Sequence, residues 1–280
     1  MRVYEIIDVS KWQGEIDWER VKASGIDGAM LRAGYGDGYI DAQFVRNARE
    51  CNRLSIPMGV YWFSYAWTNG MAAREAQHCL TAIAPYTVSL PVAFDWEYDS
   101  MDRAKKNGVS PGRAEITGYA EAFLSEIDRA GYYAANYTNL DYLTRYFDGE
   151  RLKPYDVWLA AYRNTRPTAR HNLWQYTSTG RIDGIAGNVD RNKAYVHYPS
   201  LIAGLGKNHL KEELDMTKEE LVSLAGTGDE PSAWAREAAE WAKANGIMNG
   251  DGEGNYGWQQ PITREALVTA LYHFKEYLGK

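Results

Sequence analysis

Two acidic residues close an apolar segment of the chain, and their spacing suits acid–base chemistry. In SLPVAFDWEYDS (Ser89–Ser100), Asp95 and Glu97 follow a strand pattern. Residues i and i+2 of a strand share one face, so we expect the two carboxyls to point the same way, with Cα atoms about 6.6 Å apart. Repulsion and burial raise the pKa of such a pair, so one carboxyl can stay protonated near neutral pH as a general acid. Cleavage of a glycosidic bond needs that acid and a negative group beside the oxocarbenium-like centre.

Two further acids follow apolar strand patterns elsewhere in the chain. Asp8 follows the apolar residues of IIDVS, and Asp190 lies in GNVDRN, the last strand-like segment. The carboxyl ends of barrel strands surround one active-site opening, so we expect the four acids to lie close together there. Taken alone, Asp95 and Glu97 fit an exposed strand end or an ion pair with an arginine equally well. Four acids at three strand ends favour catalysis, because clustered like charges cost stability.

Aromatic residues are abundant in the strand patterns. The chain has 10 Trp and 21 Tyr, whose flat apolar faces and polar edges suit carbohydrate surfaces. For any single ring, core packing is the alternative. The hydroxyls of Tyr61 and Tyr137 can orient a carboxylate or a substrate amide. The candidates for substrate contact are Arg32, Tyr35, Tyr61, Tyr65, Tyr137, Trp174 and Tyr176.

Strand-like and helix-like segments alternate along the first part of the chain. Helical patterns follow the first four strand patterns, and the last of these is a long helix at about residues 110–130. Repeated units of this kind predict a parallel sheet with covered faces. Eight strands predict an α/β barrel of the TIM type whose last third has lost its helices. An open doubly wound sheet is the alternative, but no glycine-rich nucleotide fingerprint follows any strand. The strand patterns cover residues 4–10, 28–36, 58–66, 90–97, 132–139, 156–162, 172–178 and 187–196.

The chain reads as three consecutive parts. Residues 1–204 form the predicted barrel, 205–231 a linker, and 232–280 a small helical domain. The linker holds a short helix candidate whose capping box is Thr217 and Glu220. In the last part, one helix is predicted to end at a glycine of WAKANG and another to begin near the threonine of ITRE.

No metal or cofactor is expected. The loop residues Asp251, Glu253 and Asn255 suggest calcium, but Tyr256 and Ile262 occupy the positions where such a loop needs glycine and glutamate. Dinucleotide, pyridoxal phosphate and haem motifs are absent. The histidines are scattered without ligand spacing, at His78, His171, His197, His209 and His273.

Composition excludes several classes of protein. A net charge of −6 and the lack of a basic cluster argue against nucleic acid as a partner. No run approaches the roughly 18 apolar residues of a membrane span. Cys51 and Cys79 lie in helix-like segments, so we expect two free buried thiols. The N-terminus enters a strand pattern at once and shows no signal peptide, which predicts synthesis in the cytoplasm.

The motifs IDVSKWQGEIDW, LRAGYG, GVYWFSYA, VAFDWE, NYTN and LWQYTSTGRIDGIAGNVDRN resemble, in this order, those of family 25 glycoside hydrolases, the Chalaropsis-type lysozymes. The resemblance covers roughly residues 4–200. It implies an irregular α/β barrel of the (β/α)5(β)3 type, with five β/α units followed by three strands. It also implies cleavage of the β-1,4 bond between N-acetylmuramic acid and N-acetylglucosamine in peptidoglycan. Glu97 matches the general acid, and Asp8, Asp95 and Asp190 match the other three acids.

The resemblance leaves the mechanism and two other functions open. Either an aspartate attacks the anomeric carbon, or the 2-acetamido group of the substrate attacks while an aspartate steadies it. We favour the second hypothesis, because Asp95 and Tyr137 can both orient that amide. A chitinase-like glycosidase is one alternative, although that class shows a longer series of acids on the fourth strand. A catalytically inactive sugar-binding protein is the other, although binding alone would not need four acids.

The segment WAKANGIMNGDGEGNYGWQQPITRE resembles one S-layer homology repeat. Such repeats usually come in threes and bind secondary polymers of Gram-positive walls, so a lone repeat can bind weakly or join chains into a homo-oligomer. The candidate wall-binding residues are Trp241, Asp251 and Arg264. Arg264 can alternatively pair with a nearby acid. The resemblances together imply an endolysin of phage or prophage type that reaches the wall through a holin-dependent membrane hole or at lysis.

Overall fold

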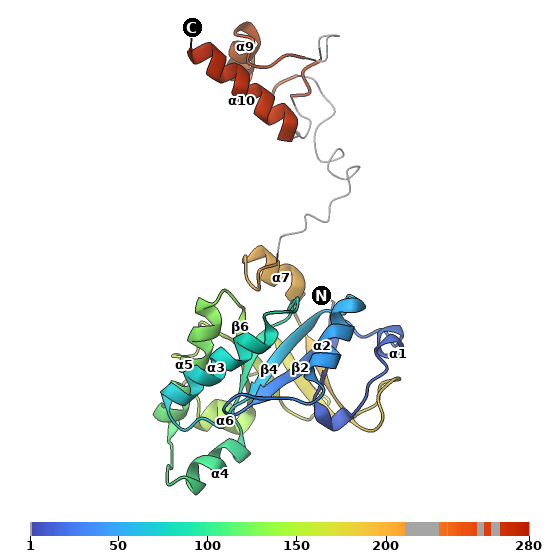
Figure 1. The fold of residues 1–280 in the computed structure, drawn as a ribbon, viewed down its shortest axis with the longest axis vertical. Coiled ribbons are helices and arrows are strands. Elements are labelled where there is room, and N and C mark those ends of the chain that lie inside the picture. The colour runs from blue at the N-terminus through green and yellow to red at the C-terminus, as the bar shows by residue number, and fades with distance from the viewer. Residues whose placement is uncertain (1, 211–229, 234, 251–254, 259–263, 280) are drawn as a thin grey trace. The chain divides into compact units, whose positions relative to one another are not determined.

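The structure, a computed structural model, describes residues 2–210, 230–233, 235–250, 255–258 and 264–279 (Figure 1). The chain divides into two compact units, 1–212 and 213–280. The predicted short helix at Thr217 lies outside the described residues. Within the part that is described, no helix is both long and apolar enough to cross a membrane.

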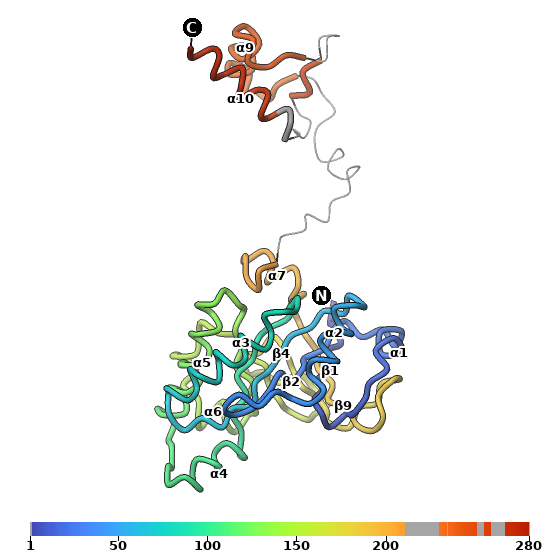
Figure 2. Tube along the Cα trace, in the orientation of Figure 1, coloured from blue at the N-terminus to red at the C-terminus, as the bar shows by residue number. Residues whose placement is uncertain are grey.

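Eight strands of the first unit close into a barrel, as predicted, and β1 pairs with β2 to complete the ring. The neighbours run parallel from β1 and β2 through to β8. Among these eight, β9 alone runs antiparallel to both of its neighbours, β8 and β1. The labels of β1 and β9 in Figure 2 mark where the first and last strands of the barrel meet. A short strand, β3, pairs only with β2. The strands are β1 (Tyr4–Val9), β2 (Gly28–Tyr35), β3 (Tyr39–Ile40), β4 (Met58–Phe63), β5 (Val92–Asp95), β6 (Ala134–Asn139), β7 (Asp156–Ala160), β8 (Leu173–Gly180) and β9 (Val189–Ala194).

Helices cover the outside of the first five strand–helix units (Figure 1). The predicted long helix at 110–130 is α5, and a separate helix, α4, precedes it unpredicted. Between β7, β8 and β9, all of which are described, the chain forms no helix, as the (β/α)5(β)3 pattern predicts. The helical segments are η1 (Lys11–Gln13), α1 (Trp18–Ala23), α2 (Phe44–Arg53), α3 (Asn69–Ile83), α4 (Tyr98–Lys106), α5 (Arg113–Arg129), α6 (Leu140–Arg145) and α7 (Tyr198–Gly204).

Alternation along the strands builds two apolar layers. Ile7 and Val9 of β1 pack outward against the helices, whereas Ile6 belongs to the cluster that fills the barrel. Asp8 has the same parity as Ile6, so it faces the interior. Cys51 and Cys79 are buried and unpaired in the outer layer, which confirms the prediction of two free thiols.

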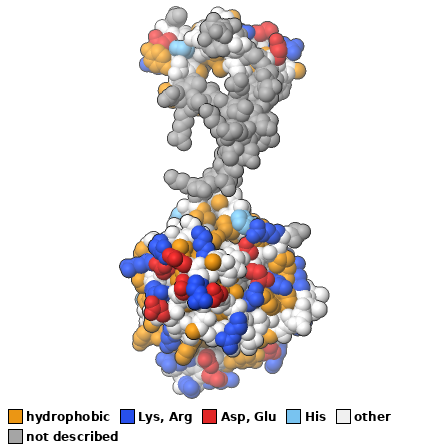
Figure 3. Space-filling model, turned by 90° about the vertical axis from the view of Figure 1, so that its right-hand side faces the viewer, with side chains coloured by type: hydrophobic (Ala, Val, Ile, Leu, Met, Phe, Trp, Pro, Cys, Tyr) orange, Lys and Arg blue, Asp and Glu red, His pale blue; other side chains and the backbone are white. Residues whose placement is uncertain are grey.

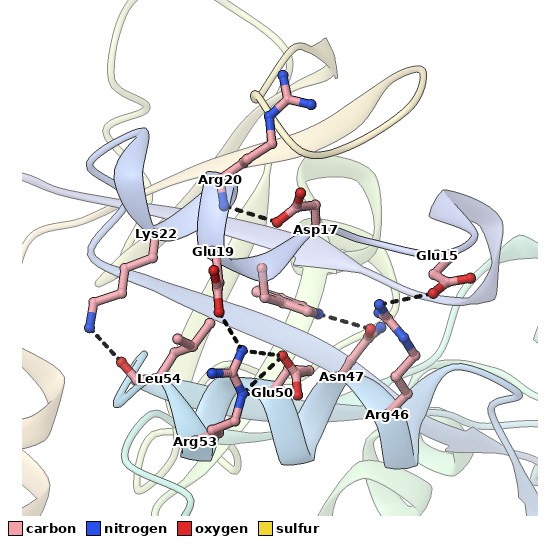
Figure 4. Close-up of polar contacts among 11 residues, drawn as sticks. Glu15, Asp17, Glu19, Arg20, Lys22, Arg46, Asn47, Glu50, Arg53 and Leu54 are labelled. Carbon is pink, nitrogen blue, oxygen red and sulfur yellow. Dashed lines mark hydrogen bonds and ion pairs between the residues drawn. The ribbon is translucent and has the colours of Figure 1, made fainter.

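Helix α1 is fastened to α2 by one buried contact and several exposed ones (Figure 4). The indole of the buried Trp18 donates to Asn47 Oδ1 at 3.0 Å. Arg53 pairs with both Glu19 and Glu50 at the surface, at 3.0 and 2.8 Å. Exposed pairs contribute little, so the buried contact holds the helix. Charges of both signs are interspersed on the face of this unit shown in Figure 3, which suits the mild net charge.

The first unit continues beyond the predicted boundary at residue 204. Asn208 is buried; its Oδ1 accepts from Tyr133 N–H at 2.6 Å, and its amide donates to Leu90 O at 3.0 Å. Lys207 pairs with Asp128 at 2.8 Å. These contacts attach the segment after α7 to the barrel.

The second unit contains two described helices, α9 (Arg236–Ala244) and α10 (Arg264–Leu278). Gly246 follows α9 with φ +65°, a left-handed conformation that glycine adopts without a steric penalty. The ring of Trp241 packs edge-on against Tyr277 of α10 at 5.5 Å between centroids. Both predicted helices of this part are therefore present.

Candidate active site

The carboxyl ends of the barrel strands surround a cavity of about 170 Å³. It brings together all four predicted acids and three of the predicted substrate contacts, Arg32, Tyr61 and Tyr137. Strand β9 runs in the opposite direction, so its first residues reach the same end as the last residues of the parallel strands. The lining consists of Asp8, Val9, Ser10, Trp12, Gln13, Arg32, Tyr61, Phe63, Asp95, Glu97, Tyr137, Trp158, Gln175 and Asp190.

Asp8 is buried and held by two amide groups. Its Oδ2 accepts from Gln175 Nε2 at 3.0 Å and from Asn192 Nδ2 at 2.9 Å. Burial, and then the charge of Asp190, raise the pKa of Asp8, against the opposing effect of these two hydrogen bonds. Burial also raises the pKa of Asp190. The amides therefore fix the Asp8 carboxyl in place while burial favours its neutral form.

Gln175 and Asn192 were not predicted as site residues. Asn192 is fully buried and its Oδ1 accepts from the indole of Trp158 at 2.7 Å. Gln175 Oε1 accepts from the hydroxyls of Tyr137 and Tyr162 at 2.9 and 3.0 Å. Asn192 lies two positions beyond Asp190 on β9, so strand parity was the signal that could have revealed it.

Asp95 and Glu97 line the cavity together, but by a different local geometry from the one predicted. Asp95 is the last residue of β5, whereas Glu97 lies beyond the strand as the N-cap of α4. The strand is short because Glu97 N–H donates to Ser100 Oγ at 3.1 Å in place of a sheet partner. The shared face therefore comes from a strand end followed by a helix cap.

The surroundings raise the pKa of both carboxyls of this pair. Burial, and then the nearby charge of Glu97, raise the pKa of Asp95 well above its ordinary value. Burial is also the main cause of the raised pKa of Glu97. A hydrogen bond with Asp95 lowers this pKa, and the charges of Asp99 and Asp190 raise it further. A carboxyl that keeps its proton near neutral pH can act as a general acid.

Aromatic rings form one wall of the cavity. Trp158 packs edge-on against Tyr61 and Tyr137, with centroids 5.7 and 4.7 Å apart. Burial raises the pKa of both tyrosines well above 10, so their hydroxyls remain hydrogen-bond donors. Tyr137 is also the register partner of Asp95 across β5 and β6.

Tyr35 and Tyr65 line an adjoining recess of about 270 Å³ rather than the acid cavity itself. Trp12, Arg32 and Phe63 line both spaces and so connect them. The guanidinium of Arg32 is bound on its other side to the buried Asp41 at 2.7 Å. The remaining residues of the recess are Lys11 and Asp99.

Trp174 and Tyr176 do not line either space. Trp174 is buried, packs in a small cluster with Leu159, and donates its indole N–H to Ala161 O at 2.8 Å. The Tyr176 hydroxyl donates to Glu5 Oε2 at 3.1 Å. Gln175 lies between them on β8, and alternation turns its side chain alone into the barrel.

Of the three predicted wall-binding residues, Trp241 is the one whose side chain the structure describes. Trp241 is 43% exposed and packs against α10. Arg264 begins α10, and Asp251 lies outside the described residues. Among the residues that are described, no group of three or more histidine, cysteine or acidic side chains is placed to hold a metal ion.

Several known proteins resemble this chain in sequence or in fold. Lysozyme M1 of Streptomyces globisporus is 31% identical over 207 residues, which cover 67% of this chain and 66% of that protein. The modular autolysin LytC of Streptococcus pneumoniae superposes with a TM-score of 0.61 and 30% identity, over 69% of this chain and 47% of LytC. A family 25 glycosyl hydrolase of Bacillus anthracis has the same fold, with a TM-score of 0.60 and 22% identity over 71% of this chain and 92% of that protein.

The first two relatives are longer than the part they share with this chain, which spans less than two thirds of each. The S-layer homology domain profile matches residues 229–267, as the resemblance of the tail predicts. The profile of glycosyl hydrolases family 25 matches residues 7–185. This match covers most of the barrel, including Asp8, Asp95 and Glu97, and the chain therefore belongs to glycosyl hydrolases family 25.

Proposed function

We propose that the barrel cleaves the β-1,4 bond between N-acetylmuramic acid and N-acetylglucosamine in peptidoglycan. The observation that carries this proposal is the enclosure of four carboxyls with raised pKa values in one aromatic-walled cavity. The relatives support the choice of substrate. One is a lysozyme, and LytC has also been solved in complex with a synthetic peptidoglycan ligand, at 31% identity to this chain.

In the proposed reaction, Glu97 donates its proton to the glycosidic oxygen as the bond to the anomeric carbon breaks. The carbonyl oxygen of the substrate's 2-acetamido group attacks the anomeric carbon and forms a cyclic oxazolinium. Asp95 accepts a hydrogen bond from the amide N–H and stabilises its positive charge. The Glu97 carboxylate then takes a proton from water, whose oxygen opens the ring with retention of configuration.

Reducing-end analysis of fragments released from purified Gram-positive peptidoglycan tests the activity. Wild type should create new reducing muramic acid ends, and Glu97→Gln should create none. Glu150→Gln, at an exposed loop position, is the matched control and should behave as wild type. Equal activity of the Glu97 variant would remove that residue from the acid role. Silence of wild type on peptidoglycan would favour a sugar-binding protein, and release from chitin a chitinase-like enzyme.

We propose that the second unit holds the enzyme at a secondary wall polymer, or joins chains through α10. The S-layer homology match supports this proposal. Tyr277 of α10 packs against Trp241, but Leu267, Val268, Leu271 and Leu278 of the same helix are exposed and available for another surface. Sedimentation of the full chain with walls, before and after extraction of the polymer, tests polymer binding. Sedimentation that needs the polymer and weakens in Arg264→Ala would support polymer binding. An increase in the mass of the protein particle with protein concentration would support the joining of chains through α10.

A further inference from the structure

A buried glutamate outside the cavity contacts the loop that holds the catalytic segment. Glu75 lies on α3 and is only 2% exposed. Its Oε1 accepts from the backbone N–H of Tyr65 at 3.0 Å. Its Oε2 is buried with no hydrogen-bond partner in the described part of the chain. Burying a carboxyl in this way costs stability, so the residue calls for an explanation beyond packing.

The loop that Glu75 holds, Ser64–Ala66, follows β4 and is bonded to the segment that carries both acids. Ser64 N–H donates to the backbone oxygen of Asp95 at 2.7 Å. The indole of Trp96 donates to Ala66 O at 2.9 Å. The loop therefore contacts the catalytic segment immediately before Glu97.

A third connection leads to Glu97 itself. Ser100 is fully buried, and its Oγ donates to Ser64 O at 2.6 Å. The same Oγ accepts from Glu97 N–H at 3.1 Å. Glu97 lies beyond the end of β5, so this bond replaces a sheet partner in fixing its backbone. Its carboxyl direction consequently depends on Ser100, and Ser100 depends on the loop.

We propose that Glu75 is a positioning residue for the hydrolase reaction, which orients the Glu97 carboxyl through the Ser64–Ala66 loop and Ser100. This inference rests on the proposed function. Glu75 is not among the residues that line the cavity. Supporting residues behind a catalytic group matter because a displacement of about 1 Å can cost about 100-fold in rate.

The neutral form of Glu75 suits this position. Burial raises its pKa to about 7, and the negative charge of Asp37 adds to that effect. The nearby hydroxyl of Ser64, the hydrogen bond from Tyr65 N–H and the charge of Arg74 oppose it. His78, one turn further along α3, faces Asp37 at 3.5 Å. Glutamine has the shape of the neutral carboxyl and can accept the same Tyr65 hydrogen bond, so it is the conservative replacement.

Steady-state kinetics on soluble, uncrosslinked glycan strands tests the proposal. Glu75→Ala should lower kcat by about 10-fold or more with KM within about two-fold of wild type, whereas Glu75→Gln should restore kcat. Cys79→Ser places a polar group in the core on the same helix; it should lower stability without changing kcat. Unchanged kcat in folded Glu75→Ala, or a loss that glutamine does not rescue, would overturn the proposal.

A variant of Ser100 tests the same chain of contacts, from Glu75 through the Ser64–Ala66 loop and Ser100 to Glu97, at the end near Glu97. It also tests the proposal if Glu75→Ala fails to fold. Ser100→Ala should lower kcat with little change in KM, and combining it with Glu75→Gln should add no further loss. If Glu75→Ala folds, its double variant with Ser100→Ala should be no slower than the worse single variant, because both break one connection. Multiplied losses, or wild-type kcat in Ser100→Ala, would contradict the path. Wild-type activity on the same strands tests the proposed function separately.

Discussion

Asp8 and Asp190 lie directly opposite each other across the antiparallel strands β1 and β9. Side chains of an opposed pair share one face, with Cβ atoms about 5 Å apart. Two carboxyls in that position repel when both are ionised, which is why the charge of Asp190 raises the pKa of Asp8. The strand pairing that closes the barrel thus also creates the acid cluster.

Asp190→Asn should stabilise the fold at neutral pH while lowering activity. Both folded-state pKa values are raised, so stability is lost as pH rises through them. The substitution removes the repulsion and should raise the free energy of unfolding by about 1 kcal/mol at pH 7, and by nothing below about pH 3, where both acids are protonated. Urea denaturation at the two pH values measures this. The exposed Asp102→Asn serves as the control, and an equal gain there would remove the repulsion as the cause.

Asp95→Asn should slow the reaction by a factor of about 100 to 10,000 with the fold intact. The amide cannot carry the negative charge that stabilises the attacking acetamido group. Rates on soluble glycan strands measure the loss. Intact-protein mass spectrometry of wild type during turnover checks the mechanism, because an acetamido-assisted reaction leaves no glycosyl group on the enzyme. A glycosyl adduct on Asp95 would instead establish that residue as the nucleophile.

Two tryptophans that are equally visible in the sequence should respond in opposite ways. Trp12 is 76% exposed at the mouth of the cavity, so Trp12→Ala should raise KM for glycan strands several-fold without changing stability. Trp174 is buried with its indole bonded to Ala161 O, so Trp174→Phe should cost about 1 kcal/mol of stability and leave KM unchanged. Enzyme kinetics and thermal unfolding of both variants distinguish substrate contact from core packing. A raised KM in Trp174→Phe would mean that Trp174 contacts the substrate.

The strands and the acids could be predicted because both follow simple local patterns. Strands such as β2 (GAMLRAGY), β4 (MGVYWF) and β5 (VAFD) are largely apolar, and each acid lies inside one of the predicted strand segments. The helix α4 escaped prediction because YDSMDRAKK has only Met101 and Ala104 as buried apolar residues. Its start is set by a tertiary contact, the bond from Ser100 Oγ to Ser64 O.

The supporting residues of the site could not be predicted from spacing along the chain. Gln175 is 167 positions from the aspartate that it contacts, Asp8, and only closure of the barrel brings them together. The same holds for Asn192. The face to which each β8 side chain points depends on the strand register. A shift of one residue in the assigned register would place Trp174 inside the barrel and Gln175 outside it.

Glu75→Gln should remove part of the pH dependence of folding. The carboxyl has a pKa of about 7 in the folded barrel, against an ordinary value of 4.5. A raised pKa means that the folded state holds a proton which the unfolded chain has released between these values. Stability from this group is therefore complete below pH 4.5 and lost as pH rises towards 7, by about 3 kcal/mol.

The difference between wild type and Glu75→Gln isolates this effect, because the cavity acids with raised pKa values are present in both proteins. Urea denaturation from pH 4 to 8 should show the variant gaining relative to wild type as pH rises, with the gain levelling off above about pH 8. The exposed Glu150→Gln should show no such trend. A constant difference across the range would mean that Glu75 is ionised in the folded barrel throughout. Its buried charge would then have to be balanced by Arg74, the cation whose charge lowers its pKa.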